Sequence, residues 1–123
     1  MSALNEGRHT GEFILAESPG TLSRDAGTVT VPASTTLSPG YVLGQVSATG
    51  KWVPYDDTAS DGREVARGVL YSELANEELS PADQTGVVIN FGAEVREEDL
   101  VWLDDADADA GIVDLAGRYI KAR

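Results

Sequence analysis

The chain has 123 residues, a length that fits one domain with a single hydrophobic core. Its 21 acidic and 9 basic side chains give a net charge of -12, which opposes nucleic-acid binding because phosphate contacts need clustered Lys and Arg. The absence of cysteine excludes disulfides and thiolate metal sites. No run approaches the roughly 20 apolar residues of a membrane span, and the N-terminus lacks signal-peptide features, so we expect a protein made inside a cell.

The N-terminal segment is polar up to Gly11, which is typical of a mobile terminus, and then becomes apolar. The apolar segment comprises Glu12, Phe13, Ile14, Leu15, Ala16 and Glu17. A turn at Ser18-Pro19-Gly20 ends it. Consecutive large apolar residues would face both sides of a strand. Two interpretations stay open: an edge strand of the domain, or an arm that adds a strand to a partner's sheet.

The polar stretch from Thr21 to Gly27 predicts a connection, and the alternation over Thr28–Val31 predicts a strand that Pro32 ends. Three β-favouring segments follow at 41–46, 51–55 and 65–71, and the Gly, Pro and Asp residues between them predict a three-stranded meander. Large aromatic residues gather here and near residue 102. We expect four of them in the core or at a subunit interface: Tyr41, Trp52, Tyr55 and Trp102.

The second half of the chain predicts fewer strands and some helix. Residues 72–81 predict an excursion between strands that Pro81 closes, and the β-branched run at 86–92 predicts a strand. The acidic start of 97–103 predicts a short helix, because acids are favoured at a helix N-terminus. A second short helix is expected to end at Gly117, with a closing strand at 118–121. The fold class is therefore mainly β with one or two short helices.

No arrangement of residues predicts catalysis, a metal or a cofactor. His9 is the only histidine and lies in the loose N-terminal segment, whereas a general base or zinc ligand needs fixed geometry. Adjacent acids are so plentiful that no pair stands out as a glycosidase pair. Asp105–Gly111 suggests a calcium loop, but positions 6 and 12 counted from Asp105 are Ala110 and Ala116, where an EF-hand needs Gly and Glu.

Three segments in this order and spacing resemble the head decoration proteins of tailed bacteriophages, the lambda gpD-like family. They are Leu37–Gly44 (LSPGYVLG), Lys51–Asp56 (KWVPYD) and Ala66–Leu70 (ARGVL). The stretches 10–18 and 22–25 resemble the longer-armed members of that family. The similarity extends over nearly the whole chain.

The resemblance implies a small β-barrel-like (β-tulip) domain over residues 21–123, with an extended capsid-binding arm over residues 1–20. It further implies a homotrimer at the threefold positions on the outer surface of an expanded icosahedral head. There the trimer would contact the major capsid protein and stabilise the shell against internal DNA pressure. Such a protein is not an enzyme, uses no cofactor, and contacts neither nucleic acid nor membrane. It would be made in the host cytoplasm, and Glu12–Glu17 would become ordered on the capsid.

Three other functions stay open from the sequence. A carbohydrate- or peptide-binding β module would need Trp52, Tyr55 and Trp102 exposed. An enzyme using an acidic pair would need a concave pocket around that pair. An acidic mimic of nucleic acid would need its charges arranged along one line.

Overall fold

The structure, a computed structural model, describes residues 10–17 and 23–123. It is mainly β with a small closed barrel, which confirms the predicted fold class. The strands are β1 (Ile14–Glu17), β2 (Arg24–Val31), β3 (Thr35–Leu37), β4 (Val42–Gln45), β5 (Trp52–Pro54), β6 (Gly68–Leu70), β7 (Leu74–Asn76), β8 (Ala82–Ile89), β9 (Ala93–Val95) and β10 (Ile120–Ala122). The helical elements are the 3-10 turns η1 (Glu97–Asp99) and η2 (Asp105–Asp107) and the α-helix α2 (Ala108–Ala116).

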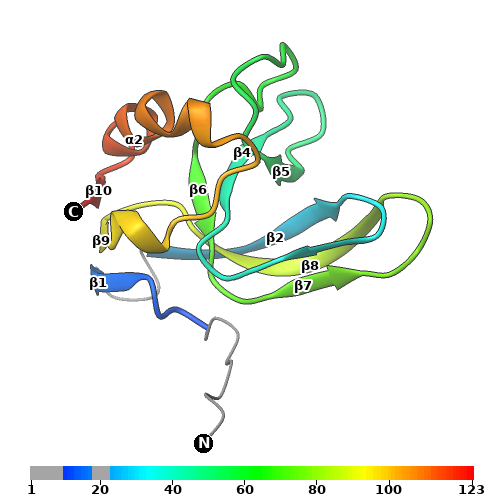
Figure 1. Cartoon of the computed structure of the whole chain (residues 1–123), viewed down its shortest axis with the longest axis horizontal. Coiled ribbons are helices and arrows are strands. Elements are labelled where there is room, and N and C mark those ends of the chain that lie inside the picture. Colours follow the sequence, from blue (N-terminus) through cyan, green and yellow to red (C-terminus); the bar gives the residue numbers. More distant parts are fainter. Residues whose placement is uncertain (1–9, 18–22) are drawn as a thin grey trace, which may run out of the picture.

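A closed barrel forms one half of the molecule, with strand order β2-β5-β4-β6-β8 (Figure 1). Its longest ladder joins β2 to β8, antiparallel and in register from Arg24↔Ile89 to Val31↔Ala82. The strand β2 therefore starts at Arg24, and the prediction of a polar connection is wrong for residues 24–27. The strand extends back to Arg24 without the alternation that marks Thr28–Val31, because β8 supplies a partner for every residue of β2. As predicted, β2 ends just before Pro32.

The predicted meander has its three strands, but in a different order. The strand β4 lies between β5 and β6, so β5 and β6 do not pair with each other. Instead β5 pairs in parallel with β2, where Val29 lies opposite Trp52, and β6 pairs with β8. Closing the barrel gives each of its strands two neighbours, and this removes the free edges that a three-stranded meander would leave.

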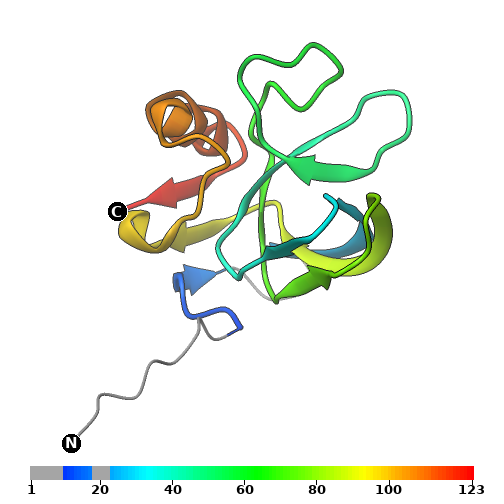
Figure 2. The same ribbon diagram turned by 45° about the vertical axis from the view of Figure 1, so that its right-hand side comes forward.

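Two smaller sheets complete the fold. The predicted excursion at 72–81 contains β7, which pairs antiparallel with β3. The strands β1, β9 and β10 form a three-stranded sheet, in which β1 is antiparallel and β10 parallel to the central β9. This sheet lies at the end of the molecule opposite the connection between β7 and β8 (Figures 1 and 2).

The helical predictions are correct in part. The helix expected over 97–103 is only a single 3-10 turn. It cannot continue, because the backbone of Val101 forms hydrogen bonds with Gly40 and Val42 in a β-bridge opposite Tyr41. The second helix is α2, and it ends at Gly117 as predicted. The closing strand β10 is also present, one to two residues later than expected.

The buried side chains form two clusters. One fills the barrel and includes Val29, Leu43, Trp52 and Val88. The Trp52 ring fits there because Gly27 and Gly68 flank it: a Cβ would lie 2.9 Å from its Nε1 at Gly27 and 3.1 Å from its Cζ3 at Gly68. The other cluster lies between the three-stranded sheet, α2 and the outside of the barrel. It contains Phe13, Tyr55, Val95, Leu100, Leu115 and Ile120.

Candidate functional site

The predicted arm segment lies, from Ile14 to Glu17, in the chain's own three-stranded sheet as the edge strand β1. Of the two interpretations of this segment, the structure shows the edge strand of the domain. The outer edge of β1 has no partner strand among the residues described. The predicted domain boundary at residue 20 falls within residues 18–22, and most of residues 1–11 also lies outside the described part of the chain.

The three large apolar residues of the segment have different surroundings. Phe13 is completely buried in the domain's own core, Ile14 is half-buried against it, and Leu15 is 44% exposed. The backbone fixes this arrangement: Arg96 N donates to Phe13 O (2.7 Å), and Gly11 N donates to Tyr71 O (3.0 Å). Gly11 has φ +70, so a residue with a side chain would be strained at this turn. Leu15 is therefore the large apolar residue of the segment that is free to meet a partner.

A polar clasp joins the end of β1 to the start of β2. The Glu17 carboxylate accepts hydrogen bonds from Ser23 Oγ (2.5 Å) and Arg24 Nε (3.2 Å), and a terminal guanidinium nitrogen of Arg24 completes the ion pair. The Arg24 guanidinium also lies 4.2 Å above the Tyr71 ring. The hydrogen bond from Arg24, against the opposing effect of burial, holds the pKa of Glu17 below its ordinary value. The clasp fixes both ends of the connection between β1 and the barrel.

An open groove of about 590 Å³ lies at the three-stranded sheet. We call it the sheet groove. Its apolar lining comes from all three strands and from the end of α2: Ala16, Ala93, Ala116, Tyr119 and Ile120. Tyr119 is 72% exposed and meets the partly exposed Phe91 edge-to-face, with ring centroids 5.4 Å apart. An exposed apolar surface beside a free strand edge is suited to binding another polypeptide.

The four aromatic residues expected in the core or at an interface do not line the sheet groove. Trp52 and Tyr55 are buried, and Tyr41 and Trp102 are half-buried against the two core clusters. Tyr55 and Trp102 meet edge-to-face at 6.1 Å and support α2. Burial first, and then the charge of nearby aspartates, raises the pKa of the Tyr55 phenol, so it stays neutral. A carbohydrate-binding face built on Trp52 and Tyr55 is therefore not formed.

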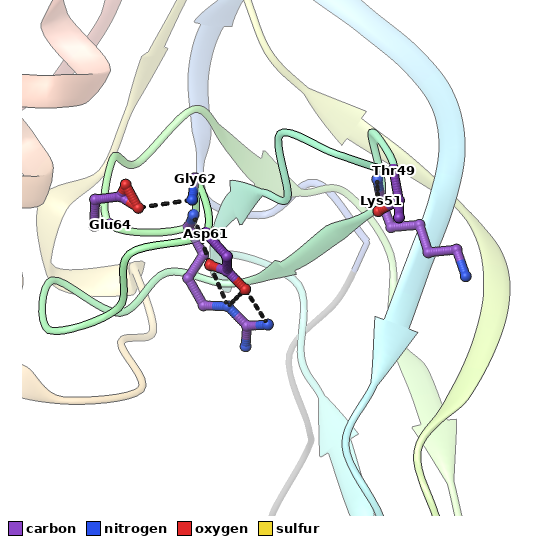
Figure 3. Close-up of polar contacts among 6 residues, drawn as sticks. Thr49, Lys51, Asp61, Gly62 and Glu64 are labelled. Carbon is purple, nitrogen blue, oxygen red and sulfur yellow. Dashed lines mark hydrogen bonds and ion pairs between the residues drawn. The ribbon is translucent and has the colours of Figure 1, made fainter.

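The acidic stretches have structural roles. Asp104 accepts a hydrogen bond from Ala106 N (3.0 Å) and so caps the start of η2, and Asp107 accepts one from Asp57 N (3.2 Å) in a distant loop. In the loop before β6, Arg63 pairs with Asp61, and Glu64 accepts from Gly62 N (Figure 3). Apart from the bond between Asp57 and Asp107, these contacts join residues two positions apart.

Residues 10–17 and 23–123 contain no group of three His, Cys, Asp or Glu side chains that could hold a metal ion. Within the same residues, no helix has the length and apolarity needed to cross a membrane. His9 lies outside them.

Comparison with known proteins decides the family. The sequence profile described as "Bacteriophage lambda head decoration protein D" matches residues 3–118, which is nearly the whole chain. The chain belongs to the lambda head decoration protein D family. No curated protein sequence matches it.

Membership of the head decoration protein D family makes this protein a capsid component of a bacteriophage virion. The family is one of structural proteins, not of enzymes, and its members associate with the capsid of the phage head. This agrees with the resemblance that the sequence segments carry.

Sequence reasoning missed the sheet groove, the exposed Phe91–Tyr119 pair and the Glu17–Arg24 clasp of this decoration protein. The three strands of the sheet come from residues 14–17, 93–95 and 120–122, and no local pattern predicts that they meet. Two weak signals were present: Gly92 directly after Phe91, which interrupts the apolar run, and the lone Tyr119 directly after Arg118.

Proposed function

We propose that this decoration protein is a cementing protein. It forms a homotrimer at the threefold positions on the outer surface of an expanded phage head, where it contacts the major capsid protein and stabilises the shell against internal DNA pressure. Synthesis takes place in the host cytoplasm. Membership of the family supports this function, and the free outer edge of β1, which presents Leu15, is the structural observation that carries it.

The proposed attachment uses the N-terminal segment in two parts. Phe13 anchors the segment to the domain, and the residues before it, together with the free edge of β1 and Leu15, bind the capsid protein by strand addition. Attachment of Phe13 to the capsid, as expected from the sequence, would first require its removal from the core. That removal costs the burial of a large side chain, about 2–3 kcal/mol.

Trimer and arm are needed together on energetic grounds. Burying Leu15 contributes about 2 kcal/mol, and ordering several backbone residues costs a comparable or larger amount. One segment alone therefore binds weakly. Three segments on one trimer bind with avidity, because the second and third attach at a high effective concentration.

A truncation tests the function directly. Deleting residues 2–9 leaves Gly11, Phe13 and β1 in place, whereas the longer deletion of residues 1–18 would also remove Phe13 from the core. Mass by light scattering should give a trimer for the wild type, for the truncation and for Leu15→Asp. Wild-type trimers should bind empty expanded heads, and both variants should bind them at least tenfold more weakly, in line with the loss of an interface anchor.

Undiminished binding of both variants to heads would reject the role of the N-terminal segment. A wild-type chain that is monomeric in solution and absent from expanded heads would reject the function itself. Salt gives a second measurement, because an apolar strand-addition contact should persist at high ionic strength, whereas attachment through the acidic surface would be screened.

A further inference from the structure

The loop between β7 and β8 presents an apolar side chain to solvent. Leu79 is 94% exposed, the highest exposure among the exposed large apolar residues of the described chain. The acidic residues Glu77 and Glu78 precede it directly. Turn positions are usually occupied by Gly, Pro, Asn, Asp or Ser, each for a local conformational reason, and Leu has none of these properties.

Hydrogen bonds from the buried side chain of Asn76 hold the loop between β7 and β8 in place. The Asn76 side chain is buried, and its Nδ2 donates to Val31 O (3.0 Å), Pro32 O (3.2 Å) and Ser80 O (3.0 Å). Its Oδ1 accepts from Glu78 N (2.9 Å), so one amide connects both sides of the loop to the end of β2.

A second connection comes from the neighbouring turn. Ser34, which has a positive φ of 51, donates its backbone N–H to Glu78 O (2.9 Å). A side chain presented on a fixed backbone loses less entropy on binding than one on a mobile loop. The loop therefore presents Leu79 in a preorganised form.

The sheet groove at the opposite end of the molecule complements this loop (Figures 1 and 2). It is apolar, and the two acids that line it, Glu17 and Glu94, already form ion pairs with Arg24 and Arg123. Lys121, which also lines the groove, forms no ion pair within residues 10–17 and 23–123.

The surface beside the groove is also basic. Arg118 donates from Nε to the Asn90 carbonyl, and no carboxylate pairs with it in the described part of the chain. The groove therefore offers two cations to an incoming acidic loop.

We propose that Leu79 of one copy inserts into the sheet groove of the next copy, with Glu77 and Glu78 facing Arg118 and Lys121. The two surfaces differ, so the contact is head-to-tail, and such a contact closes into a ring when successive copies are related by a threefold rotation. The occupant of the groove is thus a second copy of this chain. The inference rests on the proposed trimer and assigns its interface.

Cysteine cross-linking tests the contact, since the chain contains no cysteine of its own. The double variant Leu79→Cys/Ala116→Cys places one thiol on the loop and one in the groove. These elements lie at opposite ends of the molecule, so a disulfide within one chain is excluded by distance. Mild oxidation should give a covalent trimer on a non-reducing gel, and the matched variant Leu79→Cys/Leu103→Cys should give none.

A charge substitution gives an independent measurement. Leu79→Asp should leave the circular dichroism spectrum unchanged, because Leu79 makes no core contact, and should weaken trimer association at least tenfold by light scattering. The control Leu103→Asp alters a 53% exposed Leu outside the groove and should leave the trimer intact.

The outcomes separate the interface from the function. Trimers in Leu79→Asp together with no cross-linked product would overturn the assigned interface, while the proposed function would stand. A linear series of longer cross-linked products would overturn ring closure. A wild-type chain that is monomeric alone and does not bind heads would reject both the trimer and the interface built on it.

Discussion

The barrel and the three-stranded sheet use β-structure in opposite ways. In the barrel every strand has two neighbours, and all five strands come from the continuous part of the chain between residues 24 and 89. Within the described residues, the two outer edges of the sheet have no partner strands, and the sheet joins β1 and β10, which are far apart in the sequence, to β9. Closure protects the barrel from association through its edges, whereas the sheet retains edges that can pair.

This difference suggests that the barrel provides most of the stability and the sheet provides the binding surfaces. The buried side chains of the sheet share a core with the barrel. Phe13, Val95 and Ile120 pack with Tyr55 and Val69 in one buried cluster outside the barrel. Its exposed side carries Leu15, Tyr119 and the sheet groove. A rigid barrel therefore supports a less protected sheet, and substitutions in the two regions should have different consequences.

The largest effect is expected in the barrel. Trp52→Ala should lower the free energy of unfolding by roughly 3–5 kcal/mol, since the ring is 5% exposed and Gly27 and Gly68 leave a space that no other side chain fills. Chemical denaturation of the variant should show one transition at a lower midpoint. A midpoint equal to that of the wild type would show that the barrel core does not depend on this ring.

Phe13→Ala should have the next largest effect, about 3 kcal/mol, and a more local one. Removing the ring should release β1 before the barrel unfolds, so amide hydrogen exchange should accelerate in β1 and β9 more than in β2 and β8. The matched control Leu15→Ala, two residues along the chain, should change stability by less than about 0.5 kcal/mol. Equal losses of stability in Phe13→Ala and Leu15→Ala would contradict the assignment of Phe13 as the buried anchor and Leu15 as the exposed residue.

The sequence predicts the barrel better than the sheet for the same physical reason. Alternation at Thr28–Val31 and the β-branched run that ends at Ile89 are local signals, and they predict part of strand β2 and part of strand β8, though not their pairing. The Gly117 stop locates the end of α2. The central place of β4 and the joining of β1, β9 and β10 depend on pairing between distant segments, which no local pattern encodes.

The candidate site shows the same limit within a single segment. Consecutive apolar residues predict that Phe13, Ile14 and Leu15 face both sides of a strand. In the structure Phe13 lies in the turn just before β1 and is buried, whereas Leu15 in β1 is exposed. The side of the segment that faces the core is fixed by the hydrogen bond from Arg96 N to Phe13 O. Arg96 lies more than eighty positions further along the chain than Phe13. The sequence therefore identifies the segment but not the division between anchor and exposed residue.

A moderate effect is expected where α2 packs on the barrel. In Gly111→Ala the new Cβ would lie 2.2 Å from Trp102 Cζ3 and 3.0 Å from Tyr55 Cε2, so the helix or the Trp102 ring must shift. We expect a loss of about 1–3 kcal/mol and a change in Trp102 fluorescence, measured in a Trp52→Phe background. Gly117→Ala is the matched control, because its closest contact, 3.2 Å to Asp114 O, is longer. An unchanged midpoint in Gly111→Ala would show that the packing there is loose.

The smallest effect is expected at the clasp between the two regions, and it depends on pH. The folded-state pKa of Glu17 is lowered from its ordinary value of 4.5, chiefly by the hydrogen bond from Arg24 and also by that from Ser23. The clasp therefore stabilises the fold above about pH 4.5, and this contribution is lost as the pH falls through the lower folded-state pKa. Glu17→Gln should be less stable than the wild type at pH 7 by about 1 kcal/mol or less, and the difference should vanish once the pH is below the folded-state pKa of Glu17.

The pH dependence of this difference separates the clasp from simple packing. Wild type and Glu17→Gln should be compared by denaturation at each pH, since the other acids titrate in both proteins and cancel in the difference. The control Glu94→Gln breaks a more exposed ion pair, with Arg123 across the same sheet (3.0 Å), and should show a smaller difference at pH 7. If the difference in the free energy of unfolding between wild type and Glu17→Gln stayed constant from pH 7 to pH 3, the contribution of Glu17 would come from packing and not from its charge. Convergence would show that the charge of Glu17, and not its shape, provides the contribution of the clasp to stability.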